Sequence, residues 1–397
     1  GGIVFSLDGA NPASYAGDLI PSVGTPYGYA GGGYYAPGVN TGYSNIQRID
    51  YDNDTATSVE KGPLSEGRYL FDATGNTSYG YFTAGYVYPS PVRGRSTVDR
   101  LDYSSDTTTA SAKGPLAVTR YYMGSVGTDD YGYVGGGVRD DGPFTSSIER
   151  IDFSNDTATA VAKSKLTYAM DYLKATGNTS YGYIGSGRYP SGSSTTIIDR
   201  LDYSSDTTNA SPKGPLSKAT QDCGATGSSS YGYWAGGQPD YSNDTATAVV
   251  KGPLSTADGD FSATSNASSY GYWMGVASNL KVDRTDYSND TATAVQKATL
   301  SLARYSFAGV SSREHGLPTE GSPATRSATQ IDGTPYGYFA GGGDYNGVRQ
   351  TNVDRIDYSN DTATASARGQ MTGAAGYGAG ATGNNDYGYY GGGRRGP

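Results

Sequence analysis

The stretch RIDYSNDTAT (residues 355–364) decides the fold, because the chain repeats it. Near-copies begin at Arg48, Arg100, Arg150, Arg200 and Arg284, and a shortened copy begins at Asp240. A second phrase, Tyr-Gly-Tyr followed by glycines, alternates with the first and begins at Tyr27, Tyr79, Tyr131, Tyr181, Tyr231, Tyr270, Tyr336 and Tyr387. A repeat of about fifty residues is typical of repeat architectures such as β-propellers.

The spacing between the two phrases separates packed structure from loops. From the first Asp of the repeated phrase to the next Tyr-Gly-Tyr, the step is 29 or 30 residues, except for one step of 50. From Tyr-Gly-Tyr to the next Asp, the step varies between 9 and 23 residues. Fixed spacing predicts packed structure and variable spacing predicts surface loops. The long step indicates an insertion of about 21 residues (50 − 29) within residues 311–330.

Each period is predicted to form four short strands. In the third period these are RYYMGSVG (120–127), YGYVGG (131–136), SSIERIDF (146–153) and TATAVAK (157–163). Alternation along a strand places Tyr131 and Tyr133 on one face and Gly132 on the other. No stretch shows a helical period with caps. The sequence therefore predicts an all-β propeller of four-stranded antiparallel blades.

The Ser-Asn-Asp triplet of the repeated phrase is predicted to form the hairpin between the third and fourth strands. Asp and Asn side chains bond to nearby backbone groups and tolerate turn geometry. The Arg two residues before the Asp, as in Arg100 and Asp102, lies on the same strand face. This placement predicts an ion pair or a bridge between blades.

Composition limits the functions open to the chain. Its 397 residues carry a net charge of −9, which disfavours nucleic acid as a partner. No apolar run approaches the length of a membrane span, so we expect no membrane insertion. The 38 tyrosines can bury large areas while each keeps a polar tip. Such residues favour a packed fold over disorder.

The chain holds one cysteine, Cys223, and one histidine, His315. Because zinc sites are built mainly from several Cys and His ligands, and because a single His allows at most one catalytic triad, we expect neither a zinc site nor a Ser–His–Asp triad. We expect Cys223 to be a small packed residue and His315 to be exposed in a loop. The repeated Asp-x-x-Asn-Asp could offer oxygen ligands to calcium, but turn chemistry explains it fully. We expect no metal, no cofactor and no enzymatic activity.

The number of blades is open, because the sequence contains eight Tyr-Gly-Tyr strands but seven Asp phrases. The segment IVFSLDG (3–9) could supply the missing third strand, so that residues 1–21 and 378–393 would share one closing blade. We therefore expect eight blades, in a propeller that covers residues 22–397. Seven blades with a spare C-terminal hairpin, and an open stack of repeats, are the alternatives.

The repeat resembles kelch-type β-propellers over residues 22–393. The resemblance is carried by a diglycine that ends the second strand (Gly135-Gly136, Gly236-Gly237 and Gly341-Gly342), then by an aromatic and acidic third strand and a polar turn. The fourth strand departs from that family, because it lacks the usual Trp and continues into Lys-Gly-Pro-Leu at Lys61, Lys113, Lys213 and Lys251. Some kelch-type propellers are copper oxidases with Tyr and His ligands, but one histidine cannot build that site.

The wording of the repeat is also similar to that of repeat proteins encoded by marine cyanobacterial viruses. It is carried by DRIDYSNDTATAS (354–366) and YGYFAGGG (336–343). This resemblance implies a non-enzymatic virion structural protein, as a capsid decoration or a tail or fibre appendage. Its location would be the extracellular particle, and its partners would be other virion proteins in a larger assembly. The alternative is a module that binds a receptor or host surface glycan.

The variable loops are expected to lie on one face of the ring, since each joins the second and third strands of a blade. Tyr, Asn, Ser and Gly are typical of adaptable recognition surfaces. Candidate recognition residues in these loops are Tyr86, Tyr88, Arg139, Asp140, Tyr189, Tyr345 and Arg349. The tyrosines of Tyr-Gly-Tyr are expected to pack between blades instead.

Overall fold

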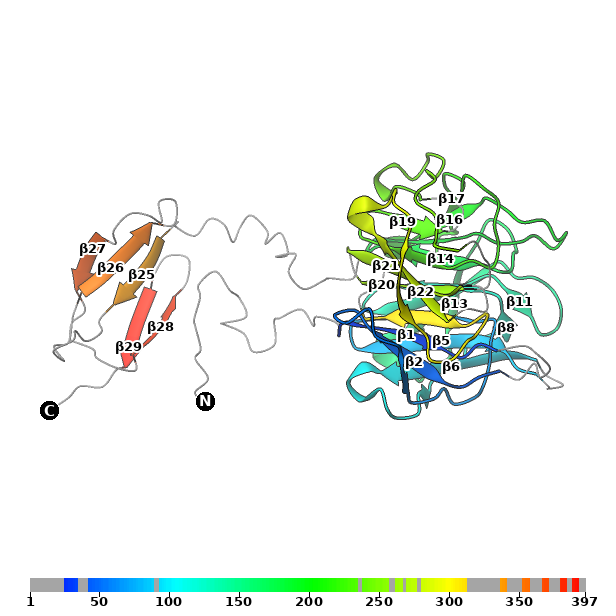
Figure 1. Cartoon of the computed structure of the whole chain (residues 1–397), viewed down its shortest axis with the longest axis horizontal. Coiled ribbons are helices and arrows are strands. Elements are labelled where there is room, and N and C mark those ends of the chain that lie inside the picture. Colours follow the sequence, from blue (N-terminus) through cyan, green and yellow to red (C-terminus); the bar gives the residue numbers. More distant parts are fainter. Residues whose placement is uncertain are drawn as a thin grey trace. The chain divides into compact units, whose positions relative to one another are not determined.

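The computed structural model describes residues 25–34, 42–88, 93–234, 238–256, 261–266, 269–276 and 280–312, and five later strands between residues 336 and 392. The chain divides into two compact units (Figure 1). One unit comprises Ser22–Glu320, and the other comprises Gly1–Pro21 with Gly321–Pro397. The unit boundary after Glu320 falls inside the region expected to form a single propeller.

Antiparallel four-stranded sheets build the Ser22–Glu320 unit, which confirms the predicted strand pattern. The first blade is β24 (Ala308–Ser311), β1 (Tyr27–Gly31), β2 (Ile46–Asp50) and β3 (Val59–Lys61). The second is β4 (Asp72–Gly75), β5 (Tyr79–Tyr86), β6 (Gly94–Asp102) and β7 (Ser111–Ala112), with β8 (Arg120–Tyr121) and β11 (Val138–Arg139) added at its edge. The third is β9 (Gly124–Gly127), β10 (Tyr131–Gly135), β12 (Ser147–Asp152) and β13 (Val161–Lys165).

The remaining sheets of this unit follow the same order. The fourth blade is β14 (Lys174–Gly177), β15 (Tyr181–Gly185), β16 (Ile198–Asp202) and β17 (Ser211–Pro212). The fifth position holds β18 (Ala225–Gly227) and β19 (Gly232–Trp234), extended by the bridges Tyr231–Asp240 and Gln238–Val249. The sixth position is the blade β20 (Ser262–Asn266), β21 (Tyr270–Val276), β22 (Lys281–Asp286) and β23 (Val295–Thr299).

The inner strands of these sheets close into a ring. They contact one another in the order β4, β9, β14, β18, β20 and β24, and β24 contacts β4 again. The closing strand β24 pairs with β1, from the opposite end of the unit, with Tyr29 opposite Val310. A β-propeller fold follows from this closure.

The expectation of eight or seven blades is wrong for the described residues, whose ring holds five blades of four or six strands and one two-stranded position. The reason is that β24, which opens the seventh repeat in the sequence, completes the blade of Tyr27 instead. The later repeats form sheets of the other unit: β25 (Tyr336–Ala340), β26 (Asn352–Asp357) and β27 (Ser366–Gln370), and β28 (Ala379–Gly383) with β29 (Gly388–Gly392). Residues 3–9, expected in the closing blade, lie outside the described residues.

The repeated turn is a capped 3-10 helix, as its Asp and Ser predict. In η2 (Tyr103–Ser105), the Asp102 carboxylate accepts a hydrogen bond from the Ser104 backbone N–H at 2.9 Å. The same cap occurs in η3 (Phe153–Asn155), η4 (Tyr203–Ser205), η5 (Tyr241–Asn243) and η6 (Tyr287–Asn289). The cap satisfies a backbone donor that would otherwise lack a partner.

The aromatic residue after the capping Asp packs against the preceding blade. Tyr103 stacks on Tyr29 with ring centroids 5.2 Å apart, and Phe153 stacks on Tyr81 at 4.4 Å. A Cβ on Gly80 would lie 2.9 Å from the Tyr103 hydroxyl oxygen. The glycine of Tyr-Gly-Tyr therefore leaves room for an aromatic ring, and the predicted packing of its tyrosines between blades is confirmed.

The second Asp of the turn joins neighbouring blades. Asp156 accepts from the Tyr81 hydroxyl at 3.1 Å, lies 2.6 Å from the Arg100 guanidinium and lies 3.4 Å from Lys113 Nζ. We call this group an inter-blade clamp. Equivalent clamps form on Asp54, Asp106, Asp206, Asp244 and Asp290, with Gln238 in place of Arg at Asp290. The predicted bridge is confirmed, although Arg100 pairs with Asp156 of the next blade instead of its own Asp102.

Candidate binding face at the mouth of the ring

One face of the ring collects the loops between second and third strands and the connections that lead into the inner strands. We call it the mouth face. The two kinds of segment pair with each other there, as Tyr69 does with Tyr86 and Asp171 with Arg188. This pairing fixes the backbone of segments that would otherwise be free surface loops.

Five residues around the mouth have an unusual backbone conformation. Leu70, Tyr122, Tyr172, Asp222 and Ser306 precede five of the six inner strands, namely β4, β9, β14, β18 and β24, and each has a positive φ between 50° and 62°. This conformation costs non-glycine residues about 1–3 kcal/mol and clusters at functional sites. Backbone hydrogen bonds hold it, because Leu70 donates to the Ser306 carbonyl and Tyr122 donates to the Leu70 carbonyl, both at 2.8 Å.

These five residues line a shallow hollow of about 10 Å³, close to the volume that one water molecule needs. A second hollow lies on the ring axis, because its lining includes Asp72, Ser125, Lys174, Ala225, Ser262 and Gly309, one from each inner strand. Lys174 lines both hollows, and its Nζ lies 3.8 Å from an Asp72 carboxylate oxygen. Asp72 also accepts from the Ser125 backbone N–H at 2.8 Å. The ring axis thus carries one carboxylate and one amino group. The equivalent residues of the other four inner strands are uncharged, so these two positions depart from the repeat.

A continuous row of tyrosine rings crosses the mouth face. We call it the tyrosine belt, and it runs in the order Tyr305, Tyr34, Tyr69, Tyr86, Tyr121, Tyr122 and Tyr172. Successive ring centroids lie 3.7 to 5.8 Å apart. All of these rings except the buried Tyr69 are partly exposed. The belt therefore offers aromatic surface to a ligand from the first through the fourth blade.

The belt ends at the mouth in a tightly held pair. The Tyr172 hydroxyl donates to the Tyr122 hydroxyl at 2.7 Å, and the Arg188 guanidinium lies over the Tyr172 ring at 4.5 Å. Arg188 is itself paired with Asp171 at 2.7 Å. Burial raises the pKa of Tyr172, and burial raises the pKa of Tyr69 to about 12. Both rings are therefore neutral at physiological pH, and the Tyr172 phenol uses its proton in the hydrogen bond to Tyr122.

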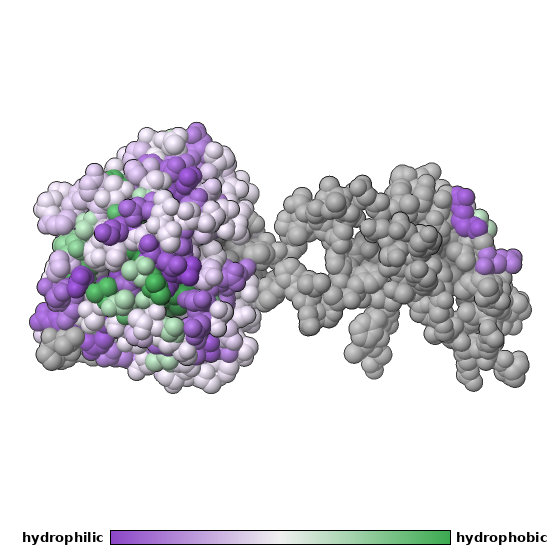
Figure 2. All heavy atoms as spheres, turned by 180° about the vertical axis from the view of Figure 1, so that it is seen from behind, coloured by the Kyte–Doolittle hydropathy of each residue, from purple (hydrophilic) through white to green (hydrophobic). Residues whose placement is uncertain are grey.

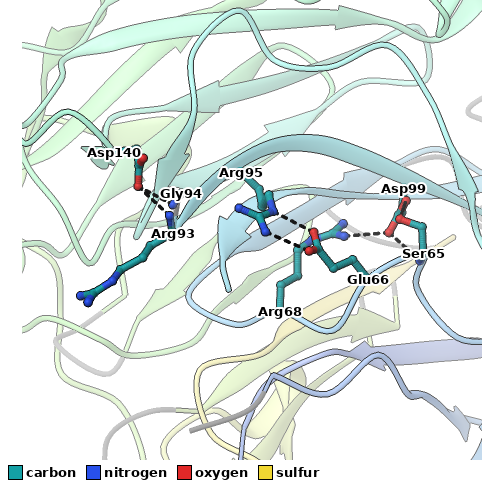
Figure 3. A network of polar contacts seen from close by, with 8 residues as sticks. All are labelled: Ser65, Glu66, Arg68, Arg93, Gly94, Arg95, Asp99 and Asp140. Atoms are coloured by element: carbon teal, nitrogen blue, oxygen red, sulfur yellow. Dashed lines mark hydrogen bonds and ion pairs between the residues drawn. The ribbon is translucent and has the colours of Figure 1, made fainter. Parts of the chain in front are cut away.

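Buried arginines support the connections beneath the belt. The fully buried Arg68 pairs with Asp99 at 2.8 Å, and Arg120 pairs with Glu149 (Figure 3 shows Arg68 and Asp99). Arg304 donates to the carbonyls of Ala30 and Gly32 at 3.2 and 2.8 Å. Burial lowers the pKa of Arg304 to about 10. These contacts hold the backbone on which Tyr69, Tyr121 and Tyr305 are carried.

The structure places five of the predicted recognition residues on the mouth face. Tyr86 belongs to the belt, and Tyr88 is 39% exposed with Arg93 over its ring at 5.8 Å. Asp140 accepts from the Arg93 and Gly94 backbone N–H groups at 3.0 and 2.7 Å, which ties two loops together (Figure 3).

Arg139 and Tyr189 are the other two of these five residues. Arg139 pairs with Asp141 at 2.7 Å on the surface, and Tyr189 packs edge-on against Tyr168 at 5.7 Å. Tyr345 and Arg349 lie outside the described residues, as does His315. Cys223 is buried, as expected. A role in recognition stays a prediction for all of these loop residues.

Sequence reasoning missed most of the belt, because it considered only the variable loops. Tyr69, Tyr121 and Tyr305 follow a buried Arg at the same place in three repeats, just before the inner strand. This recurring Arg-Tyr was the available signal. The position of this pair in a segment of nearly constant length suggested packing, so the partial exposure of Tyr121 and Tyr305 was not predicted.

Within the described ranges, no group of three or more His, Cys, Asp or Glu side chains could hold a metal ion, and no helix there is long and apolar enough to cross a membrane. Figure 2 shows small hydrophobic patches between hydrophilic residues on the face that it presents. No protein-family model matches the chain, and no curated protein matches it either.

Proposed function

We propose that the protein is a non-enzymatic scaffold that binds carbohydrate on its mouth face. The observation that carries the proposal is the tyrosine belt, which ends at the paired rings of Tyr122 and Tyr172. Sugars present apolar C–H faces and peripheral hydroxyls, and tyrosine offers an apolar ring with a polar tip. Loops rich in Tyr, Ser, Gly and Asn provide adaptable hydrogen bonding around such rings.

Rigidity supports binding in this arrangement. Ordering side chains and loops costs affinity, so a surface fixed before binding keeps more of its contact energy. Here the belt lies on a closed ring, and the sixth inter-blade clamp joins Arg284 to Asp54 across the closure at 2.6 Å. The pairing of Tyr69 with Tyr86 fixes the belt locally.

A binding experiment tests the proposal. Wild-type protein is applied to a glycan array, and its affinity for any bound glycan is then measured by calorimetry for wild type and Tyr172→Ala. We expect at least about tenfold weaker binding by the variant, which corresponds to about 1.4 kcal/mol. The control is Tyr231→Ala, because Tyr231 is 38% exposed but begins its strand at the opposite face. Equal loss in both variants, or no glycan bound by wild type, would contradict the proposal.

A structural role in a virion is the second candidate. The closed ring with clamps at all six interfaces supports it, since such a ring suits a particle component exposed to the environment. Peptide mass spectrometry on density-purified viral particles from the source material tests it. A fixed copy number per capsid protein is expected, whereas abundance only in the soluble fraction would exclude this role. Both candidates hold together if the mouth face mediates host attachment.

A further inference from the structure

We propose that the glycan bound on the mouth face carries an anionic group, a carboxylate or a sulfate ester, and that the guanidinium of Arg93 binds this group beside the tyrosine belt. This inference rests on the proposed function and adds the class of sugar. It is carried by the unpaired guanidinium of Arg93, by its fixed backbone and by its closeness to the belt.

Arg93 is an exposed arginine without an ionic partner among the described residues. Every other described arginine of the Ser22–Glu320 unit pairs with a carboxylate or, as Arg304 does, donates to backbone carbonyls. The guanidinium of Arg93 lies over the Tyr88 ring at 5.8 Å and forms no hydrogen bond or ion pair within the described part of the chain. Its planar fork of N–H donors is therefore free for a ligand.

The backbone of Arg93 is fixed, although its side chain is free. Asp140 accepts hydrogen bonds from the backbone N–H groups of Arg93 and Gly94 at 3.0 and 2.7 Å. Figure 3 shows the Arg93 side chain pointing away from Asp140 and from Glu66. Glu66 is itself paired with Arg95 at 2.8 Å. Both neighbouring carboxylates are thus engaged with other groups, and the fixed backbone reduces the freedom that Arg93 loses on binding.

Arg93 lies beside the middle of the belt. Burial is the main cause that raises the pKa of Tyr69 and of Tyr121, and the positive charge of Arg93 opposes this rise at both rings. The belt continues from Tyr121 to Tyr122, whose ring centroids are 5.4 Å apart, and then to Tyr172. A glycan unit on Tyr121 can therefore place an anionic group on Arg93 while the next unit contacts Tyr122 and Tyr172.

The charges of the chain limit the ligand to few anionic groups. Arginine binds carboxylates and comparable oxyanions through two parallel hydrogen bonds, which charge makes stronger than neutral ones. However, the net charge of the chain is −9, and two other cations at the mouth are already paired, Arg188 with Asp171 and Lys174 with Asp72. Like charges brought together at an interface suppress binding. A single anionic group on an otherwise neutral glycan fits this distribution better than a polyanion does.

A cycle of ligands and variants tests the inference on the full chain. The probes are gluco-, galacto- and manno-tetrasaccharides in a neutral form, with one uronate carboxylate and with one sulfate ester. Calorimetry measures the affinity of wild type and of Arg93→Gln for each form. We expect wild type to bind an anionic form at least about tenfold more tightly than the matching neutral form, and added salt to reduce this preference. Arg93→Gln should abolish the preference and leave the affinity for the neutral form unchanged.

The matched control is Lys218→Gln, which removes an exposed cation from the connection into β18, outside the belt. This variant should keep the preference, and the form preferred by wild type identifies the group as a carboxylate or a sulfate. Loss of the preference in both variants would mean that only net charge matters and would overturn the inference. Sugar binding by wild type without any preference also overturns it and leaves the proposed function intact, whereas absence of any sugar binding overturns both.

Discussion

At the scale of single residues, the second Asp of the repeated turn connects the blades. Asp156 is 7% exposed and receives a hydroxyl, a guanidinium and an ammonium group from the preceding blade. A buried carboxylate is stable only when it is paired and hydrogen-bonded. Since the same arrangement recurs at each interface, this residue explains why the phrase is copied so closely.

Asp156→Asn should lower the free energy of unfolding by about 2 kcal/mol, because it leaves the positive charges of Arg100 and Lys113 without their carboxylate. The estimate is below that for a fully buried pair, since Arg100 is 25% exposed. Urea unfolding followed by circular dichroism measures the change. The matched control, Asp141→Asn, removes the surface partner of Arg139 and should cost less than about 0.5 kcal/mol. Equal effects of the two variants would show that the clamp contributes nothing special.

At the scale of elements, the closing strand decides the size of the ring. β24 lies near the C-terminal end of the unit's sequence, but it supplies the inner strand of a blade whose other strands come from the N-terminal end. Propellers that close in this way bring distant segments of the chain together, and the cost is the entropy of closing a long loop. The contacts of Val310, which is fully buried, offset that cost.

Removal of residues 306–397 should therefore abolish the cooperative thermal transition of the ring, because β1 would lose its inner partner. Removal of residues 321–397 should leave the transition within a few degrees of that of the full chain. Calorimetry of both truncated proteins measures this difference. A cooperative transition in the shorter protein would contradict closure by β24.

The sequence predicted the strands and turns of each blade well, but it predicted the number of blades poorly. The fixed step of 29 residues and the turn chemistry of Asp102 and Ser104 identify the blade, because both are local properties. Whether the strand at Ala308 completes its own repeat or the blade of Tyr27 depends on ring curvature, which no local pattern records. The belt was missed for a similar reason. Tyr69 and Tyr86 lie 17 residues apart and meet only once the mouth segments pair (86 − 69).

At the scale of the whole molecule, tyrosine ionisation couples folding to alkaline pH. Burial, followed by the negative charge of Asp156, raises the pKa of Tyr81, and equivalent tyrosines such as Tyr133 and Tyr183 behave alike. The folded pKa values lie above the unfolded value of about 10. The resulting stability is therefore complete below about pH 10 and is lost as the pH rises above it, because the unfolded chain releases protons first.

The free energy of unfolding should thus fall steeply above about pH 10, more so for wild type than for Tyr81→Phe, which has one such tyrosine fewer. Urea titrations at a series of alkaline pH values provide the comparison, and tyrosinate absorbance reports ionisation. The native protein should show fewer ionised tyrosines than the unfolded chain at equal pH. Identical titration of the native and unfolded states would contradict the burial of these hydroxyls.

The central claim is that the mouth face is a carbohydrate-binding surface. Its most direct test is a crystal structure of the full chain soaked with a glycan selected on the array. The account predicts electron density for sugar rings against Tyr122 and Tyr172. Well-ordered sugar bound at another face, with the tyrosine belt unoccupied, would contradict it.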